Sequence, residues 1–566
     1  ARQPCIHPID SGGCNIVSQI YLFVTMHKKS DRYITAKITS ILIASMVTFT
    51  IVAQSPSPRP KLVVGIVVEG LREDYIDLLR GYFGPNGFNR LINGGVMMDN
   101  VDFGTQLDAT AASALIYTGA EPAVNGIPSG SVYDTATKRR ISVLHDNASI
   151  GNYTDETLSP KAIRVSTLSD EVRIDGGGIG SVYAVAPVST QSIVMAGHAG
   201  NSAFWIDDTN GKWATTTYYK DVPPPMSARN YSRPLSSRLD TLTWRPSMAP
   251  DKYPDLPAYK KYYPFRHMFQ RNDVDRFANY KTSAPVNTEV TDIASDYIKG
   301  LQLGTRDAAD MLNLAYTLAP FSKAKDSDSR LETLDSYLKL DADLSRLFDV
   351  IDKNVGLDKT FIFLSGTPSA PNTKRDDDKW GIPNGEFNPR HAVSLLNVYL
   401  MAKHGQGEWV TGYDRGQLFL NKDLIKEKDI DLKSIREEAA EFLVRMSGVS
   451  GAWTIEDIVA ARAGANSSAL KRNTTVDLSG DILIEVNPGW EIVEVNPSTG
   501  KEYRTTVRSG LMAAPVFLMY KSLAPQRLSQ PIDARAIAPS VARILRIRSP
   551  NAAQLPPLRF TLKVEN

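Results

Sequence analysis

The fold is decided by the stretch Lys61-Leu-Val-Val-Gly-Ile-Val-Val-Glu69, near the amino-terminal end of a 566-residue chain. It is a nearly continuous run of β-branched apolar residues, which is typical of a parallel strand buried on both faces of its sheet. Apolar residues at helical spacing follow over residues 72–82. A buried strand that leads directly into a helix predicts an α/β fold.

The alternation of strand and helix patterns continues along the chain. We expect strands over residues 181–187, 311–318, 359–365, 415–420 and 514–520, and helices over residues 108–118, 166–174, 288–302, 330–353, 388–404, 433–447 and 455–463. This order predicts a parallel-dominated sheet with right-handed crossovers. An Asn-Gly pair at 210–211 predicts a β-hairpin across 203–219. Because 220–285 is rich in Pro, Tyr and Arg, we expect an irregular, cap-like insertion over about 200–285.

Composition excludes several classes of protein. The chain has 64 Lys+Arg, 62 Asp+Glu and 42% apolar residues, which excludes a largely disordered chain. A formal charge of +2 provides no basic field of the kind that nucleic-acid binding needs, so no nucleic-acid partner is expected. Both cysteines, Cys5 and Cys14, precede the expected mature chain, which excludes disulfides and thiolate metal sites there.

The first sixty residues have the pattern of an export signal. A basic segment begins at Met26, an apolar segment covers 38–52, and Ala53 is a plausible cleavage position. We therefore expect residues 1–25 to be an upstream mis-called start and 26–53 a signal peptide, followed by a linker (54–60), one domain (61–548) and a tail (549–566). The mature protein is expected in the periplasm or otherwise exported, without a membrane span.

Three motifs carry a family resemblance. They are Val63 to Gly70, Tyr117-Thr-Gly-Ala-Glu-Pro-Ala-Val-Asn-Gly-Ile127, and Ala196-Gly-His-Ala-Gly-Asn-Ser-Ala-Phe-Trp-Ile-Asp207. In these motifs the chain resembles the alkaline phosphatase superfamily, in particular the type I phosphodiesterase/nucleotide pyrophosphatase-like, phosphate-irrepressible alkaline phosphatases of Gram-negative envelopes. The resemblance implies a three-layer α/β/α sandwich with a cap-like insertion.

The resemblance also implies where the chemistry should lie. Such enzymes hydrolyse phosphate esters with two Zn²⁺ ions and a Thr or Ser nucleophile at a helix amino terminus. Counted back from Tyr117, the nucleophile position is Ala109, which has no nucleophilic atom. Thr110 lies one residue later, about 100° round the helix. Asp108 stands at an N-cap position, where its carboxylate would repel phosphate.

The expected metal and phosphate-binding positions are substituted as well. The position of the first Asp ligand is occupied by Glu69, and the Asp–x₃–His pair is replaced by Pro320 and Ala324. The later Asp-His pair is replaced by Thr367 and Pro368, and the last His by Ala514. The phosphate-binding Lys and Arg fall on Val188 and Thr190. Only five His remain after residue 53, and none has metal-ligand spacing.

Two interpretations remain. In the first, the protein is a catalytically degenerate member with no cofactor, which binds or scaffolds an unknown partner, such as an envelope protein or a glycan. An aromatic stretch over 253–269 is a candidate platform for such a partner, or it seals the insertion onto the domain. In the second, the protein is an active phosphate monoester or diester hydrolase that uses Thr110, Asp108 and Ser113 with a rebuilt zinc site at Glu69.

Overall fold

The computed structural model describes residues 59–324, 328–368, 384–461, 467–495, 502–507 and 512–563. The segments predicted as an upstream start (1–25) and a signal peptide (26–53) lie outside the described residues. Within the described part of the chain, no helix is long and apolar enough to cross a membrane.

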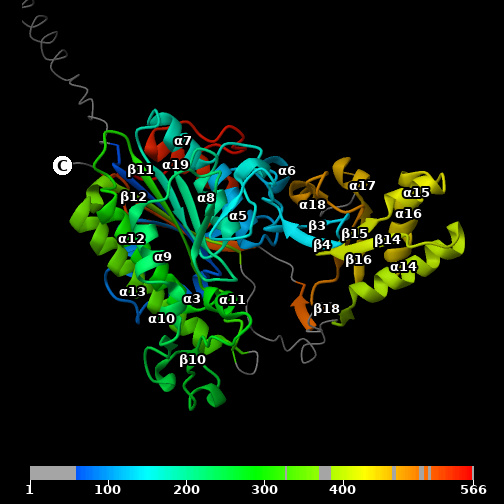
Figure 1. Cartoon of the computed structure of the whole chain (residues 1–566), viewed down its shortest axis with the longest axis horizontal. Coiled ribbons are helices and arrows are strands. Elements are labelled where there is room, and N and C mark those ends of the chain that lie inside the picture. The colour runs from blue at the N-terminus through cyan, green and yellow to red at the C-terminus, as the bar shows by residue number, and fades with distance from the viewer. Residues whose placement is uncertain are drawn as a thin grey trace, which may run out of the picture. The chain divides into compact units, whose positions relative to one another are not determined.

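A central sheet with helices on both faces forms the body of the domain (Figure 1). Its strand order is β21-β2-β20-β12-β1-β11-β6-β7-β8-β5, with β22 paired to β2. The strands are β1 (Leu62–Glu69), β2 (Val96–Asp102), β5 (Gly151–Asn152), β6 (Val182–Val185), β7 (Ser202–Ile206), β8 (Trp213–Thr216), β11 (Asp310–Thr317), β12 (Thr360–Gly366), β20 (Ala513–Met519), β21 (Gln526–Leu528) and β22 (Ile532–Asp533). β12, β1, β11 and β6 are parallel, as the sequence predicts.

Strand β1 shows why its sequence is apolar throughout. Val64 and Ile66 contribute to the core on one face of the sheet, and Val63 and Val67 contribute to the core on the other. Successive side chains of a strand point to opposite faces, so a central strand needs apolar residues at every position. The exception, Gly65, is required by crowding, since an added Cβ would lie 2.5 Å from the Tyr117 hydroxyl oxygen.

Two sets of helices form the outer layers. One core contains residues of α3 (Glu73–Leu79), α12 (Ala284–Gly300) and α13 (Arg330–Asn354). The opposite core contains residues of α5 (Ala109–Thr118), α7 (Leu168–Asp175), α8 (Ser189–Ala196) and α19 (Ile537–Leu545). This arrangement confirms the predicted α/β/α sandwich (Figure 1). The helices predicted at 108–118, 166–174, 288–302 and 330–353 are confirmed within a few residues.

The predicted insertion is only partly correct. The hairpin expected at 203–219 exists as β7 and β8, but β7 pairs in parallel with β6 and so belongs to the central sheet. Residues beyond β8 form short elements: α9 (Pro224–Ser232), α10 (Leu235–Leu239), β9 (Thr243–Trp244), β10 (His267–Met268) and α11 (Arg276–Lys281). In the aromatic stretch, Tyr253 and Phe269 are buried whereas Tyr262 and Tyr263 are exposed, so both predicted roles remain open.

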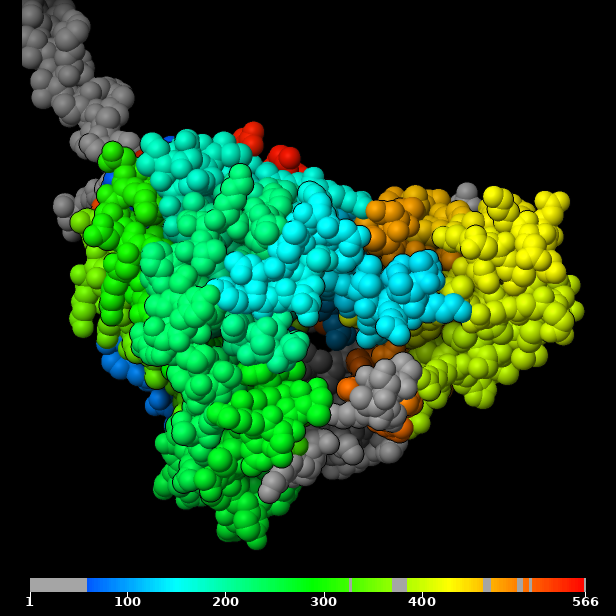
Figure 2. All heavy atoms as spheres, viewed as in Figure 1, coloured from blue at the N-terminus to red at the C-terminus, as the bar shows by residue number. Residues whose placement is uncertain are grey.

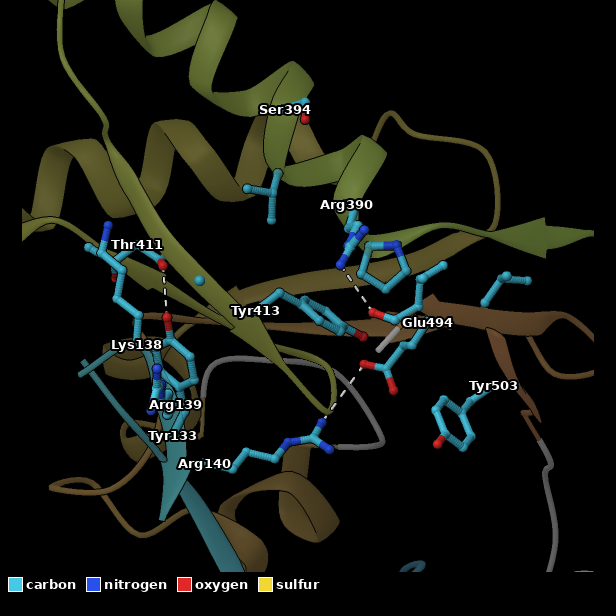
Figure 3. A pocket seen from close by; sticks show the side chains of 15 residues that line it. Tyr133, Lys138, Arg139, Arg140, Arg390, Ser394, Thr411, Tyr413, Glu494 and Tyr503 are labelled. Atoms are coloured by element: carbon cyan, nitrogen blue, oxygen red, sulfur yellow. Dashed lines mark hydrogen bonds and ion pairs between the residues drawn. The ribbon is translucent and has the colours of Figure 1, made fainter. Parts of the chain in front are cut away.

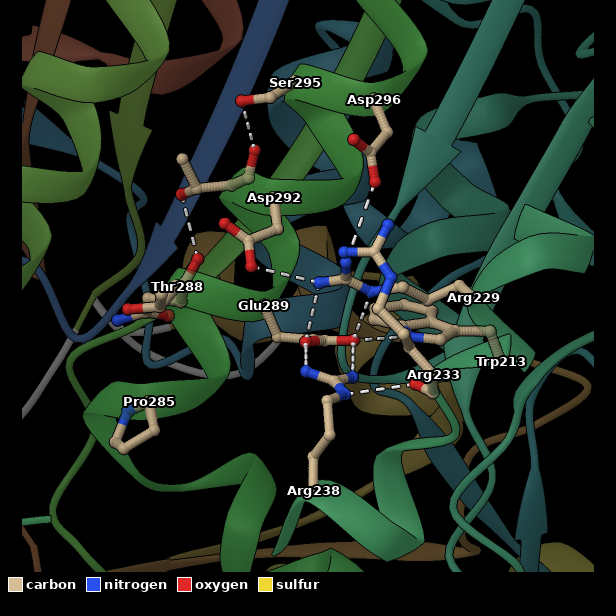
Figure 4. Close-up of polar contacts among 12 residues, drawn as sticks. Trp213, Arg229, Arg233, Arg238, Pro285, Thr288, Glu289, Asp292, Ser295 and Asp296 are labelled. Carbon is tan, nitrogen blue, oxygen red and sulfur yellow. Dashed lines mark hydrogen bonds and ion pairs between the residues drawn. The ribbon is translucent and has the colours of Figure 1, made fainter. Parts of the chain in front are cut away.

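A buried ionic cluster fastens this insertion to α12 (Figure 4). The Glu289 carboxylate accepts hydrogen bonds from Arg229 Nε at 3.0 Å and Nη2 at 2.9 Å, and from Arg238 Nη1 at 2.5 Å and Nη2 at 2.6 Å. Trp213 Nε1 donates a further bond at 3.2 Å. Burial opposes ionisation of Glu289, but the two guanidinium groups outweigh it and lower its pKa.

A second hydrophobic core lies in residues 387–492, where the sequence analysis places no separate unit. Its four-stranded sheet has the order β14-β15-β17-β16. The strands are β14 (Val410–Asp414), β15 (Gln417–Leu420), β16 (Val449–Thr454) and β17 (Ile482–Val486), and the helices are α14 (Pro389–His404), α15 (Lys422–Glu427), α16 (Leu432–Leu443), α17 (Ile455–Val459) and α18 (Ser467–Asn473). The strand predicted at 415–420 therefore belongs to a small antiparallel sheet and not to the central one.

Two hairpin-like sheets complete the described structure. One pairs β3 (Ser131–Asp134) with β4 (Arg139–Ser142), and the other has the order β13 (Glu386–Phe387), β18 (Glu491–Val495) and β19 (Glu502–Thr506). The Tyr133 hydroxyl on β3 donates a 2.8 Å hydrogen bond to the Thr411 carbonyl on β14. This contact, and the packing of Tyr133 on Phe419 at 4.7 Å between ring centroids, ties the β3–β4 hairpin to the small sheet.

Candidate functional site

Neighbouring parallel strands end side by side at one edge of the central sheet. Glu69, the last residue of β1, lies opposite Thr317 of β11, and Val68 lies opposite Gly366 of β12. In open α/β sheets, ligands bind outside the carboxyl ends of the strands. A cavity of about 520 Å³ opens at this edge, which we call the strand-end cleft. Six of the sequence-predicted positions line it: Glu69, Asp108, Ala109, Thr110, Val188 and Thr190.

Glu69 is the strand-end carboxyl in this cleft. Its side-chain carboxyl makes no hydrogen bond with any residue that the structure describes, whereas its backbone carbonyl accepts one from Leu318 N at 2.7 Å. Burial, and after it the negative charge of Asp108, raises the pKa of Glu69 from 4.5 to about 7. At neutral pH the group therefore exchanges between a carboxylic acid, which donates and accepts hydrogen bonds, and a carboxylate, which only accepts them.

Asp108 caps helix α5, as its residue type predicts. Its Oδ1 accepts a hydrogen bond from Ala111 N at 2.9 Å, and its Oδ2 accepts one from Gly130 N at 2.7 Å. Arg415 Nη1 lies 3.9 Å from the same Oδ2. A helix start is a favourable place for an anion because its amide groups are unpaired. Here the protein's own carboxylate takes that place.

The hydroxyl groups near the start of α5 are both engaged. Thr110 is 5% exposed, and its Oγ1 lies 2.7 Å from the Oγ1 of Thr190. Ser113 is fully buried, donates a 2.6 Å hydrogen bond to the Ala109 carbonyl, and does not line the cleft. The geometry therefore does not support Ser113 as a nucleophile, and it leaves Ala109 with no reactive atom.

Helix α8 supplies the opposite wall. Val188 is its N-cap residue and makes no side-chain capping bond. Gln191 in its first turn is 3% exposed, and its Nε2 is buried without a hydrogen-bond partner in the described structure. Gln191 lines the cleft. An orphaned amide donor of this kind is available to a ligand.

The remaining sequence-predicted positions lie near the strand ends but outside the lining of the cleft. These are Pro320, Ala324, Thr367, Pro368 and Ala514. Thr367 N donates to the Val68 carbonyl at 3.2 Å, so it lies beside the end of β1. Ala514 is packed closely against Gly366, and Ala324 packs against the hydrophobic core.

Several cleft residues were not predicted from the sequence. They are Arg140, Glu156, Gln191, Asp207, Asp208, Lys281 and Arg415. Trp205 Nε1 donates to Glu156 Oε2 at 2.7 Å, and Lys281 Nζ lies 2.6 Å from Asp208 Oδ1. Burial raises the pKa of Glu156, and Lys281 opposes that rise. These residues come from β4, α8, α11 and several loops, and their spacing in the sequence is not distinctive, although the Asp207-Asp208 pair before an Asn-Gly turn is a visible polar signal.

The lining is acidic. It contains five carboxyl groups, those of Glu69, Asp108, Glu156, Asp207 and Asp208, and three cationic side chains, those of Arg140, Lys281 and Arg415. No histidine of the described chain lines it. The ring of His198, from the third motif, lies instead between Asp170 Oδ2, 3.1 Å from Nδ1, and the Ile163 carbonyl oxygen, 3.0 Å from Nε2.

The donor set does not fit the zinc pair that the resemblance implies. Zinc is held by three or four convergent His, Cys, Asp or Glu ligands. Among the residues that the structure describes, no three such side chains converge to hold a metal ion. Both oxygens of Asp108 already accept backbone hydrogen bonds, and Glu69 alone has an uncommitted carboxyl.

Comparisons with known proteins agree with this architecture. The family model for type I phosphodiesterase / nucleotide pyrophosphatase matches residues 63–512. The chain is similar to alkaline phosphatase PhoV of Synechococcus elongatus, with 25% identity over 514 residues covering 88% of this chain and 92% of that protein. It is also similar to a protein named calcium-transporting ATPase from Myroides odoratus, with 26% identity covering 89% of this chain and 95% of that protein.

A crystal structure of alkaline phosphatase PafA has the same fold. It superposes with a TM-score of 0.74 at 24% identity, covering 88% of this chain and 98% of that one. At this identity the likeness concerns the arrangement of the chain and does not transfer residue roles.

Proposed function

Because this chain belongs to the type I phosphodiesterase/nucleotide pyrophosphatase family, we propose that it is a catalytically degenerate member, which binds a ligand in the strand-end cleft without hydrolysing phosphate esters. The observation that carries the proposal is the position of Asp108. Its two carboxylate oxygens accept the amide hydrogens of Ala111 and Gly130 at the start of α5. A phosphate approaching that helix start meets a fixed negative charge instead of free N–H donors.

The nucleophile and the metal ligands support the same proposal. Ala109 has no hydroxyl, and the Thr110 hydroxyl is buried against Thr190. Glu69 would have to serve both as the general base for Thr110 and as the ligand of a metal ion that stabilises the phosphoryl charge. Phosphate-ester hydrolysis needs one of the largest rate enhancements known, which such a site does not supply.

The acidic lining describes the ligand that the cleft would accept. Five carboxyl groups against three cations disfavour a ligand with net negative charge. The unpaired Gln191 amide and the titrating Glu69 acid offer hydrogen bonds to hydroxyl groups. A hydroxyl-rich, uncharged ligand such as an envelope glycan therefore fits this chemistry better than a phosphate ester.

We extend the proposal to the location of the protein. The export pattern over 26–53 supports a protein of the cell envelope, processed near Ala53. Amino-terminal sequencing of the protein secreted from its natural host tests this. A mature chain that starts near residue 54 is expected, and a cytoplasmic chain with an intact amino terminus would contradict it.

The metal content tests the degenerate function without any guess about substrate. Protein purified without chelators and analysed by mass spectrometry for metals should contain well under one zinc ion per chain. Two tightly held zinc ions per chain would instead establish the alternative, an active hydrolase with a rebuilt metal site at Glu69.

Turnover is the second test. The wild-type protein and Thr110→Ala, purified in parallel, should hydrolyse aryl phosphate monoesters and diesters no faster than buffer. If the wild type and Thr110→Ala hydrolyse the substrates at the same low rate above buffer, the activity comes from a contaminating phosphatase. A rate that is present in the wild type and lost in Thr110→Ala, with Ser113→Ala as the matched control, would overturn the proposal.

A further inference from the structure

A second cavity of about 850 Å³ lies on the other side of the β3–β4 hairpin (Figure 3). The hairpin, the amino-terminal turn of α14, β14 and the β18–β19 pair line it. We call the second hydrophobic core and its four-stranded sheet, within residues 387–492, the small subdomain. Figure 2 shows the surface where the β3–β4 hairpin meets it. We call this the hairpin cavity. Its volume is within the range of small-molecule binding sites.

The hairpin cavity has the opposite charge character to the strand-end cleft. Its lining contains four cations, Lys138, Arg139, Arg140 and Arg390, and one carboxylate, Glu494. Lys138 is paired with Glu408 at 2.8 Å, and Arg140 is paired with Asp414 at 2.5 Å. These partners neutralise two of the four cations.

The other two cations have no carboxylate partner among the residues that the structure describes. The Arg139 side chain makes no hydrogen bond or ion pair with any of them, and the Arg390 guanidinium donates to the backbone carbonyl of Val495 at 3.1 Å. Glu494 lies 4.0 Å from Arg140. Arg139 and Arg390 therefore remain available to an oxyanion, which a guanidinium binds through paired hydrogen bonds.

An independent observation marks the centre of the cavity. The hydroxyl group of Tyr413 is buried, and its proton has no acceptor within the described structure, although the Gly416 backbone amide lies near the oxygen. In Figure 3 the Tyr413 ring projects between Arg390 and Arg140. Burial raises the pKa of Tyr413, so the hydroxyl keeps its proton and remains a donor. A buried hydroxyl without a partner is costly unless a ligand or water satisfies it.

Apart from Ser394, Thr411 and the cavity's charged residues, the lining is made of apolar or aromatic side chains and glycine. It includes Tyr133, Pro389, Val393 and Val493. Such a wall fits a planar or apolar body. We propose that the hairpin cavity binds a small ligand that carries a carboxylate or phosphate-type oxyanion on an aromatic or apolar body, with the oxyanion held by Arg139, Arg390 and the Tyr413 hydroxyl.

The test uses non-hydrolysable probes, so it does not depend on the proposed loss of catalysis. Isothermal titration of the purified full chain with phenylphosphonate and with benzoate should show saturable binding. Benzyl alcohol, which has the ring but no charge, should not bind measurably. Comparing the dissociation constants of phenylphosphonate and benzoate shows whether the cavity prefers a phosphonate or a carboxylate.

Variants locate the binding. Arg139→Ala and Arg390→Ala should each weaken binding about tenfold or more, because each removes a charge-assisted hydrogen bond. Tyr413→Phe should weaken binding severalfold while changing the melting temperature little, since the hydroxyl proton has no acceptor in the free protein. Arg445→Ala, an exposed arginine of the same subdomain, should bind as the wild type does.

The contrary outcomes are equally clear. Absence of binding by either anion, or unchanged affinity in both arginine variants, would overturn the proposal. Of the two cavities, Lys281 lines only the strand-end cleft. Loss of affinity in Lys281→Ala would therefore place the anion in that cleft, and would overturn both this proposal and the inference that the acidic lining of the cleft disfavours anionic ligands.

Discussion

Thr110 Oγ1 lies 2.7 Å from Thr190 Oγ1, so the first turns of α5 and α8 are joined by a buried hydrogen bond between two hydroxyl groups. The two helices approach each other at the edge where β1 ends. The bond gives the Thr110 hydroxyl a structural partner in the place where a nucleophile would have to remain free.

Thr110→Val should destabilise the protein by about 1 kcal/mol, because it leaves the buried Thr190 hydroxyl without its partner. Urea unfolding measures the change. Thr190→Val and the double variant complete the cycle. The double variant should cost less than the sum of the two single variants. Strictly additive effects would show that the two hydroxyls do not stabilise each other.

Glu69 should make stability fall with rising pH. Its pKa in the folded protein, about 7, is above its ordinary value of 4.5. A group with a raised pKa contributes stability that is complete below about pH 4.5 and is lost as the pH rises through about 7. The loss is at most about 3 kcal/mol.

The matched variant for this prediction is Glu69→Gln, which removes the ionisation but keeps the shape. Its stability should not decline between pH 4.5 and 7 as that of the wild type does. Asp108→Asn should lower the pKa of Glu69, because the Asp108 charge is the second cause of its rise. A wild-type profile that is flat across this window would show that Glu69 ionises freely in the folded protein.

Glu289→Gln should cost about 3 kcal/mol of unfolding free energy, since it removes the buried counter-charge of Arg229 and of the half-buried Arg238, although Arg229 keeps Asp292 at 3.1 Å. Guanidinium unfolding followed by circular dichroism is the measurement. Glu437→Gln is the control, because Glu437 pairs with Lys433 at 3.7 Å on the exposed face of α16 and should cost less than about 1 kcal/mol. Equal costs in the two variants would contradict the stabilising role of the buried cluster.

His198 should titrate above its ordinary pKa of 6.5. The hydrogen bond to Asp170 is the main cause, and the Ile163 carbonyl adds to it. Both ring nitrogens face acceptors, at 3.1 Å and 3.0 Å, and only the protonated ring donates from both. The resulting stability is complete below pH 6.5 and is lost as the pH rises through the raised pKa.

Proton NMR titration of the His198 ring gives this pKa directly. In Asp170→Asn the pKa should return toward 6.5. The amide oxygen can still accept the hydrogen of Thr167 N, but the bond from Ala199 N to Oδ1 is lost, so the stability of the variant is measured alongside. An unshifted pKa in the wild-type protein would mean that the ring is held in one neutral tautomer.

The sequence predicted those parts of the fold whose side-chain pattern reflects burial directly. Strand β1 is apolar throughout because it is covered on both faces, and the Asp108 cap follows from the chemistry of the side chain. The strand at 417–420 was assigned to the wrong sheet, because alternation shows that a strand is half-buried but not which partner it pairs with. The charged lining of the strand-end cleft was not predicted, because Glu156, Asp208 and Lys281 come from segments that are far apart in the sequence.

Arg140 lines both the strand-end cleft and the hairpin cavity, so strand β4 lies between an acidic site and a basic one. A substitution of Arg140 therefore changes the electrostatic environment of the strand-end cleft and of the hairpin cavity at once. Changes in the lining of one site near Arg140 are therefore limited by the charge that the other site needs. We expect the linings of the two sites to change together among descendants of this chain.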